Sequence, residues 1–337
     1  MQKITRPNLL QLCQRGGLLV ALLWLGLQAL AQPYPHYLMA GEAMPTTVLL
    51  QTRLAQQENI TYTNVHDKVA LMQADLPGAA GWVRFVWKLY KGAAAASYSP
   101  WLQASAAGDY IVRYRIAGLG PGQRLQYAVQ YGSDTLSTSQ SPWQTAAIPA
   151  GKQSTKKTSI ALVTCSHLTR FYLGGGFGAP STQGAAAYTG ADKLEGFHGY
   201  ASIARLKTDY LIANGDNVYY DHPDGEIATT VPQMRAMWHR QLAMPRLRNM
   251  LASTTTYWLK DDHDHRFDDS DTMPVHPKHG SLPTHAQGRQ MFIEQAPVRE
   301  HYHPDSPTYR TIRINQWLQI WLLEARDHRS PNAMPDG

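Results

Sequence analysis

Three short apolar segments in the second half of the chain each end abruptly in side chains that can bind metal ions. Residues 159–164 run into Cys165, residues 210–214 run into Gly215-Asp216, and residues 254–259 run into a cluster of aspartates and histidines. Continuous apolar runs of this length are typical of parallel strands that are buried on both faces. Because parallel strands end at the same edge of a sheet, the side chains that follow them are predicted to meet there.

The segments around these strands indicate an α/β layered domain. Residues 231–252 have helical periodicity, and residues 318–325 form a further apolar run. Strands that alternate with helices are typical of layered α/β folds. We therefore predict such a domain over residues 158–337, preceded by a polar linker at residues 149–157 that contains glycine and proline.

Residues 32–148 have a different pattern and are predicted to form a fibronectin/Ig-like β-sandwich. Short strands with alternating side chains are separated by turn signals, as is usual in sandwiches. Trp82, Trp87 and Trp143 have two interpretations, as sugar-binding platforms or as parts of the core, and alternating aromatics favour the core. The strands are expected at residues 46–54, 81–90, 109–119 and 125–132.

The first 31 residues are predicted to be a signal peptide. Three basic residues precede an apolar run that ends in Ala29-Leu30-Ala31, which predicts cleavage before Gln32. A retained membrane anchor is the alternative, but the run is shorter than the ~20 residues usual for a span. The mature protein is therefore expected to be exported, periplasmic or extracellular, with no stable membrane span.

Charge and cysteine usage narrow the function classes. Removing residues 1–31 takes away three basic and no acidic residues, so the formal net charge falls from +6 to 6 − 3 = +3, without any block of Lys or Arg. No specific nucleic-acid binding is expected, and the oligomeric state is not specified. Cys165 remains as the single cysteine of the exported chain, so it is expected to be buried or to coordinate a metal.

The residues after the strands form a mixed set of potential ligands. Hard cations prefer carboxylate oxygens, whereas thiolate and imidazole suit iron or zinc, so this set favours a site with more than one metal. Two cations can clamp a phosphate and activate a water, and a nearby histidine can protonate the leaving oxygen. Besides Cys165, the set comprises Asp216, Tyr219, Tyr220, Asp221, His222, Asp261, Asp262, His263, Asp264 and His265.

Each of these segments also has a plainer interpretation. An acidic run such as residues 261–271 is often a solvated loop, Gly-Asp after a strand is often a turn, and Cys165 alone could be a small buried residue. Their placement after three separate strands favours a shared site.

At these residues the chain resembles the PhoD-like alkaline phosphatases and phosphodiesterases, a branch of the metallophosphoesterase superfamily. The resemblance covers nearly all of residues 39–337, and its motifs follow one another in the family's order. The segments that carry it are residues 39–54, 110–132, 163–168, 212–221, 258–271 and 322–331.

The resemblance implies a centre that contains iron and calcium. Cys165, Asp216 and Tyr219 would be ligands of the iron. Asp216 would also bridge to calcium, with Asp262 serving this second cation. His263 would lie beside the phosphate as electrophile or proton donor.

The chain also departs from the family pattern. Leu259 and Lys260 separate Trp258 from the aspartate pair, and Glu324 stands where aspartate is frequent. A Gly-Asp-x-His block, which supplies a histidine iron ligand in the family, is missing. We therefore expect the chain to be incomplete at its C-terminus, to bind metal poorly and to hydrolyse little.

The leading hypothesis is an exported metal-dependent phosphoesterase that acts on phosphomonoesters or phosphodiesters through attack of a metal-activated water. Its partner would be a small phosphoester substrate. Two alternatives are a non-enzymatic calcium-binding module of the cell surface and an inactive fragment.

Overall fold

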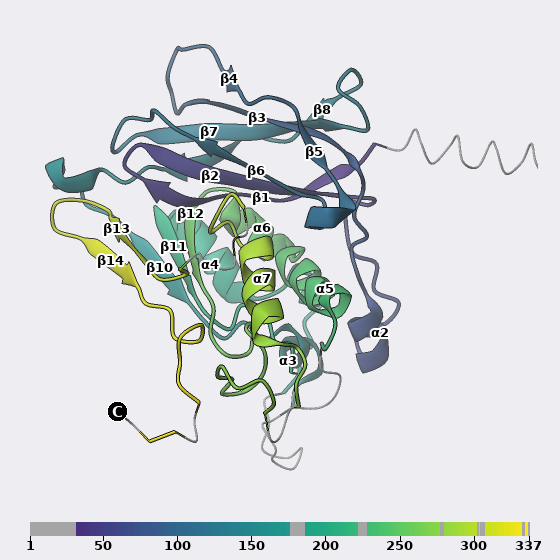
Figure 1. Ribbon diagram of the computed structural model, residues 1–337. Coiled ribbons are helices and arrows are strands. Elements are labelled where there is room, and N and C mark those ends of the chain that lie inside the picture. Colours follow the sequence, from purple (N-terminus) through teal and green to yellow (C-terminus); the bar gives the residue numbers. More distant parts are fainter. Residues whose placement is uncertain are drawn as a thin grey trace, which may run out of the picture.

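The computed structural model describes residues 32–175, 186–221, 228–276, 280–301, 303, 307–331 and 334–335. The predicted signal peptide and His222 lie outside these ranges. Figure 1 shows a β-sandwich packed against one end of a layered α/β part. Within the described ranges, the helices are too short or too polar to cross a membrane.

The N-terminal part is the predicted antiparallel β-sandwich. One layer contains β1 (Tyr34–Met44), β2 (Thr47–Ala55) and β6 (Ile111–Ile116). The other contains β3 (Gly81–Leu89), β4 (Ser97–Tyr98), β5 (Leu102–Ala104), β7 (Arg124–Gly132), β8 (Ser139–Gln140) and β9 (Gln144–Ala147). Alternate side chains of facing strands, such as Leu50, Phe85 and Tyr127, are fully buried between the layers, as the period-2 pattern requires.

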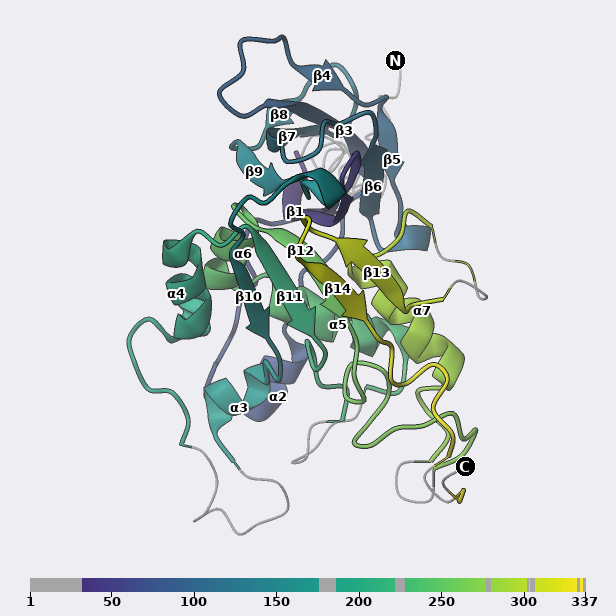
Figure 2. The ribbon, with the colours of Figure 1, turned by 90° about the vertical axis from the view of Figure 1, so that its left-hand side faces the viewer.

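A mixed sheet of six strands connects the sandwich to the α/β part (Figure 2). Its order is β10-β11-β12-β1-β2-β6, and β10 (Ile160–Val163), β11 (Tyr210–Asn214) and β12 (Thr255–Leu259) are parallel neighbours. β1 pairs with β12 in parallel, with Gly41 opposite Thr256. The sheet therefore runs through both predicted domains, whose borders at residues 148 and 158 stay a prediction.

Helices cover one face of this sheet, where Leu211 and Ala213 of β11 join the largest hydrophobic cluster. The predicted helical segment 231–252 forms two helices, because Pro245 disfavours a helical backbone at Met244, whose ψ is 125°. The helices are α2 (Lys68–Gln73), α3 (Leu168–Leu173), α4 (His198–Leu206), α5 (Val231–Leu242), α6 (Pro245–Leu251) and α7 (His285–Gln295).

On the opposite face, the second layer of the sandwich covers β1, β2 and β6. The hairpin of β13 (Arg310–Arg313) and β14 (Gln319–Leu322) covers part of the rest. The hairpin packs against Tyr210 and Tyr257. All of β12 is buried, as expected for a strand covered on both sides. That expectation is wrong for β10 at the sheet edge, where Leu162 is 64% exposed.

Candidate metal centre

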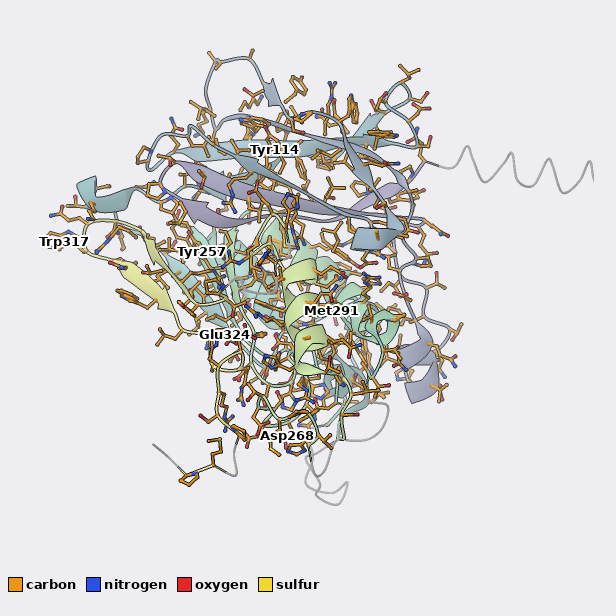
Figure 3. The ribbon with its side chains drawn as sticks, viewed as in Figure 1. Tyr114, Tyr257, Asp268, Met291, Trp317 and Glu324 are labelled. Carbon is orange, nitrogen blue, oxygen red and sulfur yellow. The ribbon has the colours of Figure 1, made fainter. Side chains whose placement is uncertain are left out.

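The ends of β10, β11 and β12 bring the predicted ligands to one rim of the sheet. Cys165 follows β10, Asp216 follows β11 and Asp262 follows β12. The three strands are parallel and in register, so their carboxyl ends lie side by side. In Figure 3 the labelled Asp268, from the loop after β12, lies at the end of the molecule remote from the sandwich.

The backbone at this rim is held in an uncommon conformation. Cys165 and Asp216 have positive φ values of 57° and 52°, and Gly215 has a φ of 89°. Non-glycine residues adopt this region rarely, and such strain is concentrated at functional sites. The amide of Ser166 donates to the carbonyl of Asp216 over 3.0 Å, which ties the two strand ends together.

Asp216 lies at the centre of the predicted set. Its Oδ2 accepts hydrogen bonds from Cys165 Sγ at 3.4 Å and from Tyr219 Oη at 3.2 Å. Its Oδ1 is buried and has no hydrogen-bond partner among the described residues. Ligand atoms of Asp216, Asp262 and His263 lie within 4.8 Å of one another. The structure therefore brings all five predicted site residues together.

Burial makes this cluster costly without a cation. It raises the pKa of Asp216, an effect that His263 opposes and Asp262 reinforces. Burial and the charge of Asp216 also raise the pKa of Tyr219. An unpartnered, buried carboxylate oxygen beside further carboxylates is the environment that a bound cation would stabilise.

His263 has a buried partner that the sequence did not single out for this role. Its Nδ1 lies 2.7 Å from Asp221 Oδ1. Burial alone would lower the pKa of His263, but the hydrogen bond and charge of Asp221 raise it to about 9. The imidazolium is thus favoured at neutral pH. Tyr220, which the sequence also offered as a potential ligand, is instead a core side chain that accepts a hydrogen bond from Trp238.

Hydrogen bonds of Asp264 and ring stacking on Tyr219 fix the loops that carry these ligands. Asp264 is fully buried and accepts hydrogen bonds from the amide of Asn217 at 3.0 Å and from that of Asp261 at 2.6 Å. It thereby connects the loop after β11 to the loop after β12. Tyr219 stacks between His167, with ring centroids 4.0 Å apart, and His263, at 4.4 Å. No spacing in the sequence identifies these contacts.

The structure also decides the plainer interpretations. Residues 262–267 are buried, so the solvated-loop interpretation is wrong for them and holds only for exposed Asp268 and Asp269. Cys165 is exposed, which excludes its interpretation as a buried apolar residue. Its thiol is instead available to a ligand at the rim.

The two departures from the family pattern compensate each other. Lys260 is fully buried and forms an ion pair with Glu324, and its Nζ lies 2.6 Å from Asp327 Oδ1. The lysine before the aspartate pair therefore neutralises the unusual glutamate. This network holds the segment after β14 against the loop after β12.

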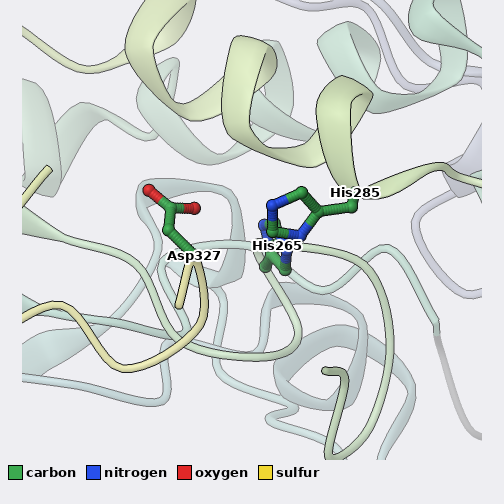
Figure 4. Close-up of side chains that lie close together, drawn as sticks. All are labelled: His265, His285 and Asp327. Atoms are coloured by element: carbon green, nitrogen blue, oxygen red, sulfur yellow. Dashed lines mark hydrogen bonds between the residues drawn. The ribbon is translucent and has the colours of Figure 1, made fainter. Parts of the chain in front are cut away.

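A second group with ligand potential consists of His265, His285 and Asp327 (Figure 4). His265 Nε2 lies 3.1 Å from His285 Nδ1. Burial lowers the pKa of both imidazoles, and the charge of Lys260 lowers that of His265 further. Because Lys260 already neutralises Asp327, a cation would have to displace an ammonium group. The cluster around Asp216 is therefore the better candidate for a metal centre.

A cavity of about 550 Å³ lies away from these ligands, and neither group of potential metal ligands found among the described residues lines it. It is lined by the start of β1, by α6 and by the segment around Trp143.

Trp143 is 38% exposed, so its predicted place in the core is wrong. Trp87 does pack against the sandwich core beside Tyr114, which Figure 3 labels.

Comparisons with known proteins support the resemblance. Residues 177–336 match the family model described as PhoD-like phosphatase. The structure matches a solved structure titled "Structure of PhoD" with a TM-score of 0.63 and 17% identity. That match covers 89% of this chain and 53% of the other, so the chain spans about half the length of PhoD. The match to this structure confirms the predicted fold class.

A second solved structure is the purple acid phosphatase PPD1 from yellow lupin (Lupinus luteus) seeds. It has a TM-score of 0.47 and 10% identity, and the match covers 84% of this chain and 43% of the other. Comparison with curated protein sequences finds no significant match.

Proposed function

Since residues 177–336 match the PhoD-like phosphatase family, to which the chain therefore belongs, we propose that it is an exported, metal-dependent phosphoesterase. It would hydrolyse small phosphomonoesters or phosphodiesters. The predicted signal peptide supports export to the periplasm or the extracellular space.

The convergence of ligands at three strand ends carries this proposal. A thiol, a phenol, two carboxylates and an imidazole meet around Asp216, whose Oδ1 is buried without a partner among the described residues. A structural turn does not require this arrangement, and a buried carboxylate oxygen without a hydrogen-bond partner destabilises the fold. The arrangement is consistent with a cation-binding centre.

The donor set suits two different cations. Cys165, Asp216 and Tyr219 would hold iron, because thiolate and phenolate are soft or strongly basic ligands. Asp216 and Asp262 would hold calcium through their carboxylate oxygens. When bound, such a pair clamps a phosphoester and lowers the pKa of a coordinated water.

His263 would act on the phosphoester as electrophile or proton donor. Asp221 holds its Nδ1, so Nε2 is the nitrogen directed away from this partner. The same carboxylate favours the imidazolium, which has a proton to give to the leaving oxygen. Asp221 thus positions His263 and fixes its charge without contact to the substrate.

The test uses the purified chain supplied with iron and calcium. We expect hydrolysis of p-nitrophenyl phosphate, of its bis-ester or of both, and we expect Asp216→Asn and Asp262→Asn to reduce the rate at least about 100-fold. Metal content is measured in the same samples, so that the rate is compared at a known metal occupancy. If a fully loaded chain leaves both esters intact, the proposal is wrong.

The calcium-binding module is separated from the enzyme by spectroscopy. An iron centre with Tyr219 as ligand would have a tyrosinate-to-iron absorption band in the visible, which Tyr219→Phe would remove. A calcium-only site would lack the band, and calcium binding would be unchanged in Cys165→Ser. These two results together would favour the calcium-binding module.

A further inference from the structure

Arg326, in the segment after β14, reaches across to the loop that carries the predicted ligands. Its Nε donates to Asp261 Oδ1 over 2.7 Å, and its Nη1 donates to the carbonyl of Ser270 over 3.1 Å. Its Nη2 lies 3.4 Å from Asp262 Oδ1. The side chain is 12% exposed. Figure 3 labels Glu324 and Asp268, which belong to these two segments.

The three nitrogens of this guanidinium make contacts of different length. Charge-assisted N–H···O bonds are usually about 2.7–2.9 Å long, and only the Nε contact with Asp261 falls in that range. The contact between Nη2 and Asp262 is longer. Nη2 therefore faces the predicted cation site without a short hydrogen bond to it.

The charge of Arg326 matters most when no cation is present. Asp262 then has the guanidinium as a nearby positive charge. Cations at Asp216 and Asp262 would take over this compensation, because a divalent ion in direct contact outweighs a guanidinium at longer range. The Nη2 donors would then be available to an anion held at the same cations.

We propose that Arg326 is a substrate-binding residue that holds a phosphoryl oxygen once cations occupy the aspartates beside it. This inference rests on the proposed function and adds a named recognition residue for the anionic group of the substrate. Arginine suits this role because its planar fork of N–H donors matches phosphate oxygens.

A phosphate-binding role and a purely structural role predict opposite changes in calcium affinity for Arg326→Gln. If Arg326 only braced the loop, Arg326→Gln would weaken cation binding and phosphate binding together. If it receives the phosphate, removal of its charge should strengthen calcium binding, by about fivefold for one partly screened charge. Phosphate binding to the calcium-loaded chain should weaken about 10- to 100-fold, as for loss of a charge-assisted hydrogen bond.

Arg329 provides a matched control in the same segment. Its Nη1 lies 2.7 Å from Asp269 Oδ1, and its side chain is 34% exposed. Asp269 is also a neighbour of Arg326, at 3.4 Å. Arg329→Gln therefore also removes one positive charge from beside the loop after β12, but on the outer side of that loop. It should change neither the calcium affinity nor the phosphate affinity by more than about twofold.

The experiment is calorimetric titration of the full chain, first with calcium and then with inorganic phosphate as the probe. The wild type, Arg326→Gln, Arg326→Lys and Arg329→Gln are compared, with urea unfolding to establish that each is folded. Arg326→Lys keeps the charge but not the fork, so it should reverse the gain in calcium affinity and restore only part of the phosphate affinity.

The proposal is overturned if Arg326→Gln weakens both affinities, if it leaves phosphate affinity unchanged, or if the calcium-loaded wild type binds no phosphate. Ester hydrolysis is measured separately. A wild type that binds phosphate through Arg326 but cleaves neither p-nitrophenyl ester would refute the proposed function and support this inference.

Discussion

The replacement Asp221→Asn is expected to remove much of the pH dependence of stability that His263 contributes. Asp221 Oδ1 lies 2.7 Å from His263 Nδ1, and the two side chains are only 4% and 8% exposed. Asparagine keeps the shape and can still accept the hydrogen bond from Nδ1. Its amide nitrogen would replace Oδ2, which accepts a hydrogen bond from the amide of Asp268. Loss of that bond lowers stability by a similar amount at each pH, so the pH dependence still reports the change in charge.

The magnitude follows from the shift in the pKa of His263. Burial alone would lower this pKa, but Asp221 is the main cause of its rise from 6.5 to about 9. At 1.36 kcal/mol per pKa unit, the difference corresponds to roughly 3 kcal/mol in favour of the imidazolium. Asp262 and Asp216 also raise the pKa, so the variant should lose about 2 kcal/mol of this term.

The direction of the shift in the pKa of His263 determines the pH values at which stability is compared. Because the folded pKa lies above the unfolded value, the contribution is fully present below about pH 6.5 and is lost as the pH rises through about 9. Urea unfolding of the metal-free chain at about pH 6 and about pH 9.5 should therefore show a loss of roughly 3 kcal/mol for wild type and roughly 1 kcal/mol for Asp221→Asn.

A nearby carboxylate serves as the control. Asp268 Oδ1 lies 3.9 Å from His263 Nε2, and its side chain is 53% exposed. Asp268→Asn should therefore leave the pH dependence close to that of wild type. Equal losses for wild type and Asp221→Asn would refute the assignment of Asp221 as the partner that fixes the charge of His263.

Three further predictions concern stability. Gly215→Ala would force an alanine to a φ of 89° and place its Cβ 2.6 Å from the side chain of Asp261. Thermal unfolding should therefore show that the variant loses about 1–3 kcal/mol of stability. The control Gly199→Ala, whose Cβ would enter open space, should lose none. Lys260→Met would remove the ammonium partner of the buried Glu324 and Asp327 and should cost about 3–5 kcal/mol in urea unfolding. A loss below about 1 kcal/mol would contradict the network. Burial would raise the pKa of Asp109, but the hydrogen bond and charge of His239 hold it below its ordinary value. This contribution is present above the unfolded pKa of about 4 and is lost as the pH falls further, so Asp109→Asn should flatten the acid limb of a stability–pH curve, and an unchanged limb would rule this out.

The strand ends and their ligands could be predicted because they depend on local pattern. Each apolar run occupies one strand, and parallel strands must end at a common rim. This rule places Cys165, Asp216 and Asp262 at one edge of the sheet. Asp216 is central because β11 lies between β10 and β12, an order that the structure supplies.

Contacts between distant segments could not be predicted in this way. Asp221 pairs with a histidine that lies 42 residues further along the chain. Lys260 meets Glu324 across 64 residues. β1 enters the sheet beside β12, although Gly41 and Thr256 are far apart in sequence. Local periodicity contains no signal for such pairings, because they depend on how whole elements pack.

The central claim is that Cys165, Asp216, Tyr219 and Asp262 surround a shared pair of cations, with His263 beside them. Anomalous diffraction at the iron edge, from crystals of the chain grown with iron and calcium, tests it most directly. We predict an iron peak within bonding distance of Cys165 Sγ, the Asp216 carboxylate and Tyr219 Oη. Iron bound elsewhere, with Asp216 Oδ1 still without a ligand, would contradict the account.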